Sequence, residues 1–84
     1  MNIRESIRTL QRYDDVHVTE LTALIEAIEE ALTDKTISEP QFADLMVDVE
    51  RLKTIIQEAE DLALNQVIHD SVMGLIALAK ALKP

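Results

Sequence analysis

Three short stretches of this sequence hold side chains that could do chemistry. Residues 33–42, TDKTISEPQF, supply oxygen donors of the kind that bind Ca²⁺. Asp14, His17 and Glu20 follow one another at intervals of three, which on a helix would place two carboxylates and an imidazole on one face, as in a helical di-metal site. Residues 69–71 read His-Asp-Ser, the residue types of a hydrolytic triad.

Residues 33–42 resemble the second half of an EF-hand loop, in which an I-S-x-x-E-F end leads into a helix. With Ile37 aligned as the central hydrophobe, Leu32 falls on a ligand position and Lys35 on the turn glycine. Gln41 falls on the terminal bidentate glutamate, and its neutral amide cannot replace that carboxylate. The lysine also brings a cation to the place of the Ca²⁺. The resemblance therefore implies no functional calcium site.

The same residues fit the start of a helix at every position. Ser38 is a preferred N-cap, and Gln41 three residues later completes a capping box. Ile37 and Phe42 are placed to form a hydrophobic staple across the cap. Pro40 lies in the first turn, where its missing N–H breaks no helical hydrogen bond. We therefore interpret this stretch as the beginning of a helix.

The other two stretches lack the partners that a site needs. Successive residues on a helix point about 100° apart, so residues 69–71 cannot form a catalytic relay by themselves. A di-metal site needs several inward-facing ligands from other helices, whereas nearly all other acids of this chain fall on polar faces. The sequence thus predicts neither an enzyme nor a metal or other cofactor site.

Hydrophobic periodicity predicts that helices position all of these residues. One glycine and two prolines in 84 residues leave few tight turns, and this favours helices over a β-sandwich or barrel. We expect one all-α domain, a small bundle of three to four helices with a long third helix and a strongly apolar last helix. The predicted helices span residues 2–13, 15–33, 39–62 and 65–82.

The third and fourth predicted helices bury different faces. A heptad-like apolar seam runs from Phe42 to Ala63, and a new seam, one residue out of step, starts at Leu64. One residue is about 100° of rotation, so we favour a break, at which Asp61 or Asn65 could cap the new helix. The main core is expected to contain Leu21, Leu24, Ile28, Leu32, Ile37, Phe42, Leu45, Val49, Leu52 and Ile56.

The charge of the chain is strongly acidic in its middle. The net charge is −8, with +2 over residues 1–13, −12 over residues 14–70 and +2 over residues 71–84. Such a field repels nucleic acid, and Tyr13 and Phe42 are the only aromatic rings on which bases could stack. The sequence therefore argues against direct nucleic-acid binding.

Composition also bears on the expected compartment. Without cysteine, disulfides and thiolate metal sites are impossible. No segment approaches the roughly 20 apolar residues of a membrane span, and residues 1–15 lack the apolar core of a signal peptide. We expect a soluble, cytoplasmic protein with no membrane span.

The last predicted helix carries the clearest sign of a binding function. Residues 72–79 are apolar on all sides, which is typical of a helix buried against others. Gly74 within it favours a close helix crossing. We expect association through helix contact, either with a second copy or with the helix of a protein partner. The candidate interaction residues are Val72, Leu75, Ile76, Leu78 and Leu82.

Arg4, Arg8 and Arg12 form a second candidate interaction surface, a basic stripe at i, i+4 and i+8. Three arginines without Trp or Phe make a weak membrane anchor. An acidic stripe that includes Glu26 and Glu30 is the more economical partner, in this chain or in a second copy.

The expected role is that of a small acidic regulatory or accessory protein. The alternative is a phage-type inhibitor of a larger protein, such as an antiholin-like lysis regulator, an anti-sigma-like factor or an acidic DNA mimic. A mimic needs dense negative charge over one face, and Lys35, Arg51 and Lys53 interrupt the acidic middle. These alternatives are analogies of type, without a motif behind them.

Overall fold

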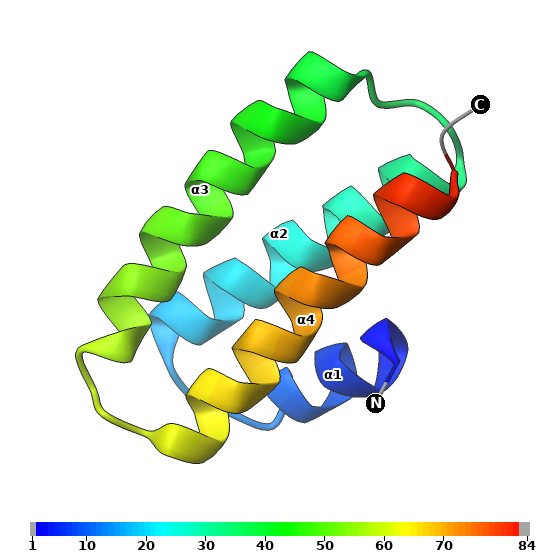
Figure 1. The fold of residues 1–84 in the computed structure, drawn as a ribbon. Coiled ribbons are helices and arrows are strands. Elements are labelled where there is room, and N and C mark those ends of the chain that lie inside the picture. Colours follow the sequence, from blue (N-terminus) through cyan, green and yellow to red (C-terminus); the bar gives the residue numbers. More distant parts are fainter. Residues whose placement is uncertain (1, 83–84) are drawn as a thin grey trace.

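The computed structural model describes residues 2–82, which form four helices and no strand (Figure 1). This confirms the predicted all-α bundle with its apolar last helix. The first helix ends at Leu10, three residues before the expected end, because the backbone turns there toward the next helix. The helices are α1 (Ile3–Leu10), α2 (Val16–Thr33), α3 (Glu39–Gln57) and α4 (Leu62–Ala81).

Each helix begins at a side chain that accepts a hydrogen bond from the first turn. Asn2 Oδ1 accepts from the Glu5 N–H at 2.9 Å, and Asp15 caps α2. At α3, Ser38 Oγ accepts from the Gln41 N–H at 3.3 Å, while the Gln41 side chain accepts from the Ser38 N–H at 2.9 Å. This reciprocal pair is the predicted capping box, so the interpretation of residues 33–42 as a helix start is confirmed.

The chain breaks between α3 and α4, as the shift of the apolar seam predicts. α3 ends at Gln57, five residues earlier than expected, and Glu60 then adopts a left-handed backbone with φ of 56°. Asp61 caps α4 by accepting from the Leu64 N–H at 3.0 Å. α4 consequently starts at Leu62, before the expected position.

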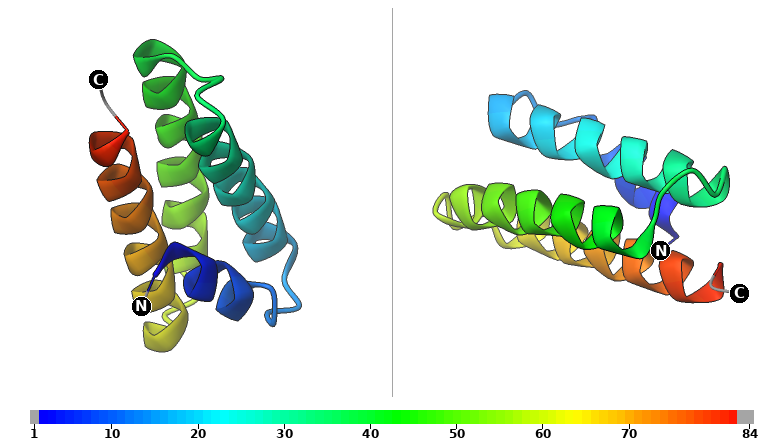
Figure 2. Two further views of the ribbon diagram at one scale, coloured as in Figure 1. Left: turned by 90° about the vertical axis from the view of Figure 1, so that its right-hand side faces the viewer. Right: turned by 90° about the horizontal axis from the view of Figure 1, so that it is seen from above.

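Short connections make α2, α3 and α4 successively antiparallel, and α1 lies across α2 and α4 (Figures 1 and 2). The two ends of the bundle therefore collect different helix termini. The end formed by the last turns of α2 and α4 and the first turn of α3 is called the lysine end, after Lys35 and Lys80. The opposite end is called the acidic end, after Asp14, Asp15, Glu58, Glu60 and Asp61.

The core contains half of the ten expected side chains, and the other half lie at its edge. Leu21, Ile28, Leu32, Val49 and Ile56 are buried, whereas Leu24, Ile37, Phe42, Leu45 and Leu52 are partly buried against them. The difference arises because α3 lies at one side of the bundle and buries only Val49 and Ile56 completely. The remaining buried apolar side chains are Ile7, Leu10, Val18, Ile25, Leu64, Ile68, Val72 and Leu75.

α1 approaches α4 closely at the only glycine of the chain. A Cβ added at Gly74 would lie 3.2 Å from the Cβ of Ile3, which is tighter than ordinary van der Waals contact. Ser6 and Ser71, small residues on the same two helices, are fully buried. The predicted close crossing at Gly74 is thus present, and it explains why the helix accepts a residue of low helix propensity there.

Replacing Gly74 by valine should destabilise the fold, because the added methyl groups would overlap Ile3 and push α1 away from α4. Overpacking of this kind costs about 1–3 kcal/mol. Ala77→Val adds the same side chain on the exposed face of α4 and should cost about 0.5 kcal/mol or less. Urea unfolding followed by circular dichroism compares the two variants. Equal free energies of unfolding would contradict a close crossing.

Candidate functional site

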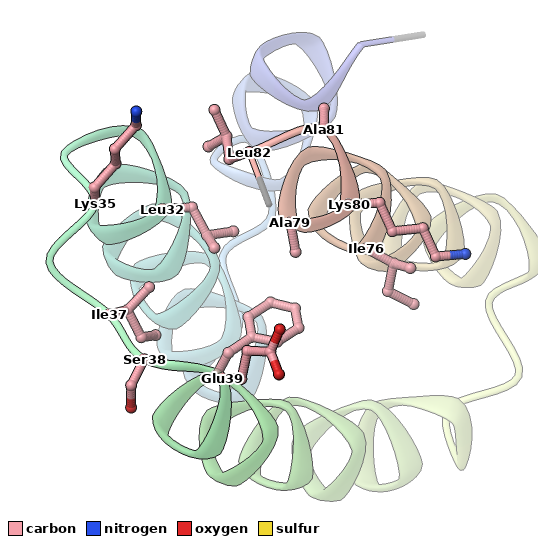
Figure 3. Close-up of a pocket in the computed structure, with 11 residues that line it drawn as sticks. Leu32, Lys35, Ile37, Ser38, Glu39, Ile76, Ala79, Lys80, Ala81 and Leu82 are labelled. Atoms are coloured by element: carbon pink, nitrogen blue, oxygen red, sulfur yellow. The ribbon is translucent and has the colours of Figure 1, made fainter. Parts of the chain in front are cut away.

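The lysine end contains an apolar pocket, called the end pocket. It has a volume of about 740 Å³ and opens between the last turns of α2 and α4 and the first turn of α3. In Figure 3, Leu32, Ile37 and Ala79 point into this space, and Lys35 and Lys80 lie at opposite sides of it. The residues that line it are Leu32, Lys35, Ile37, Ser38, Glu39, Phe42, Ile76, Ala79, Lys80, Ala81 and Leu82.

The turn between α2 and α3 builds one wall of the end pocket. α2 ends when Lys35 takes a left-handed backbone with φ of 57°, which lets the Thr36 N–H donate to the Ala31 carbonyl at 2.9 Å. The chain then reverses into the Ser38 cap of α3. Ile37, between the turn and the cap, is thereby held with its side chain toward the pocket (Figure 3).

The mouth of the end pocket carries more positive than negative charge. Lys35 and Lys80 are exposed, and neither belongs to an ion pair between residues 2–82. Glu39 is the one acid among the lining residues and lies at the positive N-terminal end of α3. Within a chain of net charge −8, the lining of this pocket thus has two cationic side chains and one anionic side chain.

The five apolar candidate residues of α4 divide between core and pocket. Val72 and Leu75 are buried, with 5% and 0% of their surfaces exposed, so their side chains belong to the core of the single chain and not to an accessible surface. Ile76, Leu78 and Leu82 are partly buried, and Ile76 and Leu82 line the end pocket. The accessible part of the predicted surface is therefore its pocket edge.

The basic stripe of α1 faces acids of α2 in the same chain. Arg4 forms an ion pair of 3.3 Å with Glu29, whose side chain is only 12% exposed. Gln11 Nε2 donates to Glu26 Oε1 at 3.0 Å, and Arg8 lines the same polar groove of about 500 Å³. Arg12 is exposed and lies outside the residues of this groove. Arg4 thus helps to dock α1 within the monomer, and Arg8 lies beside the same groove.

The residues that the sequence suggested for catalysis or metal binding form helix caps and hydrogen bonds within helices. Ser71 Oγ is buried and donates to the Val67 carbonyl at 2.9 Å, while Asp70 Oδ1 accepts from Gln66 Nε2 at 3.0 Å. His17 contributes its backbone N–H to the Asp15 cap. Among residues 2–82, no group of three or more His, Cys, Asp or Glu side chains is placed to hold a metal ion.

Sequence reasoning assigned Ile37 and Phe42 to the core and did not single out Lys35, Ala79 or Lys80 for the site. The hydrophobic staple predicted for Ile37 and Phe42 was a local signal that both lie near the lysine end. The pocket itself arises because three helix ends leave space between them, and helical periodicity along one chain segment does not report that spacing.

The expectation that no segment approaches the length and apolar character of a membrane span was wrong for α4. α4 is long and apolar enough to cross a bilayer by length and composition, with a mean hydropathy of 1.4, and 28% of the most apolar window is buried. Counting uninterrupted apolar residues missed this, because polar residues such as Asn65, Gln66 and Asp70 interrupt the run without lowering the average enough. Core helices of soluble proteins can meet the same criterion, and one face of α4 forms part of the core here.

Comparisons with protein-family models, with curated proteins and with solved structures find no match to this chain. A candidate function therefore follows from the pocket and the accessible side chains of the chain alone.

Leu75→Ala should destabilise the monomer by about 2–5 kcal/mol, because it leaves a cavity at a fully buried site. Leu75→Asp should unfold it outright, since a carboxylate would be buried without a partner. Met73→Ala, at a half-exposed position of the same helix, should change stability by about 0.5 kcal/mol or less. Thermal and urea unfolding measure these effects. A folded, stable Leu75→Asp variant would contradict the position of Leu75 in the core.

Glycine at Lys35 or Glu60 should stabilise the fold, because both residues hold left-handed backbones with φ near 57°. The net gain is about 0.5–1 kcal/mol, the strain relieved minus the extra entropy of glycine in the unfolded chain. Glu58→Gly is the matched control, since Glu58 has a helical φ of −62° and should lose stability instead. Opposite signs in urea unfolding are the expected result, and equal signs would contradict the backbone strain.

Proposed function

We propose that this chain is a non-enzymatic binding module that associates with another protein chain through the end pocket. The observation that carries the proposal is an open, mainly apolar pocket in a chain too small to leave core surface uncovered without cost. The occupant in this proposal is the apolar side chains of a helix, from a partner or from a second copy. The role would be regulatory or accessory.

The chemistry of the lining supports a protein occupant over a polar small molecule. A volume of about 740 Å³ is within the usual range for ligand pockets, roughly 300–1,000 Å³, but such pockets orient their ligands by several convergent polar groups. Ser38 is the only hydroxyl of the lining, and its oxygen already accepts from the Gln41 N–H. The remaining lining offers apolar contact with charges at the mouth, which suits aliphatic side chains flanked by acids.

The composition of the pocket also supports a function without catalysis. No His and no Cys line it, and its one hydroxyl, on Ser38, is engaged in the cap of α3. The chain's one His-Asp-Ser sequence lies outside the pocket lining, and the Ser71 hydroxyl donates a hydrogen bond to the Val67 carbonyl. The proposal therefore assigns the pocket to recognition.

Ala79→Trp should abolish association, because the indole would fill the end pocket that Ala79 lines. Ala77→Trp places the same ring on the exposed face of α4 and is the matched control. The immobilised variants are compared for proteins retained from host lysate, and the free variants for molar mass by light scattering. We expect at least about a tenfold loss of binding, equivalent to 1.4 kcal/mol, for Ala79→Trp alone.

Circular dichroism and thermal unfolding establish that both variants are folded before binding is compared. The proposal is contradicted if folded Ala79→Trp retains the same partners and the same molar mass as the unmodified chain. It is also contradicted if the unmodified chain neither self-associates nor retains any protein that depends on Ala79.

A further inference from the structure

The acidic end carries the most exposed large apolar side chain among the described residues. Leu62, the first residue of α4, has 83% of its surface exposed. Glu58, Glu60 and Asp61 precede it within four positions, so three acidic residues lie beside one exposed leucine in the sequence. A leucine left in water in this way contributes nothing to the core of its own chain.

The end pocket at the lysine end has the complementary character. It is apolar inside, and Lys35 and Lys80 stand at its mouth against the single acid Glu39. α3 joins the two ends, and its 19 residues span roughly 28 Å at 1.5 Å per residue. The projection and the pocket therefore lie on opposite ends of one molecule, too far apart to meet within it (Figure 1).

Both ends also hold a charged residue in a strained backbone. Lys35 has φ of 57° and Glu60 has φ of 56°, each just after a helix end where glycine is the usual residue. Strain of this kind persists when the surrounding structure imposes it. The two residues have opposite charge. Glu60 lies beside Leu62, and Lys35 lies beside the end pocket.

We propose that a second copy of this chain occupies the end pocket, with Leu62 of one molecule inserted into the pocket of the next. This inference rests on the proposed function and names the occupant. The carboxylates of Glu58, Glu60 and Asp61 then approach Lys35 and Lys80 of the receiving molecule. At physiological ionic strength the Debye length is about 8 Å, so these local pairs act while the repulsion between two chains of charge −8 is largely screened.

Such an interface is head-to-tail, because the two contacting surfaces differ. A pair of molecules keeps one free pocket and one free leucine, so association continues into open chains or closes into a ring. The contact involves one projecting side chain and its turn, which is small compared with stable interfaces. The assembly is therefore expected to be weak, in rapid exchange and dependent on concentration.

A mixing experiment tests whether the projection of one molecule binds the pocket of another. Leu62→Ser removes the projection and keeps the pocket, whereas Ala79→Trp fills the pocket and keeps the projection. Sedimentation velocity follows each variant alone and the two together. The protein concentrations are about 0.05–1 mM, where weak association is detectable. Val47→Ser, at a position with 59% exposure on α3 away from both ends, is the control for loss of an exposed hydrophobe.

We expect the unmodified chain and Val47→Ser to associate. Leu62→Ser alone and Ala79→Trp alone should each self-associate with an affinity lower by at least about tenfold. The mixture should recover a single complex with one molecule of each variant and nothing larger, because only one intact projection and one intact pocket remain. A structural defect in one variant does not produce this pattern. Growth of the unmodified chain beyond two molecules separates the head-to-tail arrangement from a symmetric dimer that makes both contacts at once.

Exposed charges supply a second test if Ala79→Trp does not fold. Lys80→Glu should weaken association alone, and so should Glu60→Lys. Mixing these two variants should restore two contacts: the original pairing of Glu60 with Lys80, and a reversed pairing of the introduced lysine with the introduced glutamate. Glu60→Gly should also weaken association by removing the carboxylate, although the same change is expected to stabilise the monomer.

The outcomes separate this inference from the proposed function. An unmodified chain that stays monomeric at 1 mM, or a mixture that recovers no complex although the unmodified chain associates, overturns the second copy as occupant. In that case a partner whose binding is lost in Ala79→Trp but kept in Leu62→Ser preserves the proposed function. If folded Ala79→Trp keeps both self-association and partner binding, the second copy as occupant and the proposed function are both overturned.

Discussion

The close approach of α4 to α1 at Gly74 is the constraint on which the other features of this bundle depend. α4 packs more extensively against the eight-residue α1 than against the 19-residue α3. A helix drawn toward one neighbour leaves less contact for the helix on its other side, because side chains fill only the space within their reach. α3 therefore keeps several apolar residues at the edge of the core, and the space between its first turn and α4 remains open as the end pocket.

Local sequence signals predicted most of this fold. The capping box at Ser38, the cap at Asp61 and the change of seam at Leu64 are properties of neighbouring residues, and each is present in the structure. The glycine crossing was also predictable, because only a close contact compensates for Gly74 in a helix interior. These features depend on spacing along one helix, which a single sequence records directly.

The candidate site was predicted much less well, for a physical reason. Hydrophobicity marked Leu75 and Ile76 alike, yet Leu75 is fully buried and Ile76 lines the pocket, one residue and about 100° away. Which of two such faces becomes core depends on how neighbouring helices tilt. The position of Lys35 opposite Lys80 across the pocket likewise results from the antiparallel order of the helices. That relation joins residues 45 positions apart and has no local signature.

The turn that builds the pocket wall is fixed by hydrogen bonds at both of its ends. The Thr36 N–H is held by the Ala31 carbonyl, and the Ser38 N–H is held by the Gln41 side chain. Ile37 between them is thereby preorganised, and under the proposed function an incoming side chain would meet a wall that loses little conformational entropy on binding. Affinity at this site is then sensitive to the caps that set the turn as well as to the atoms that touch the occupant. Residues with no contact to a partner can in this way determine how long the partner stays.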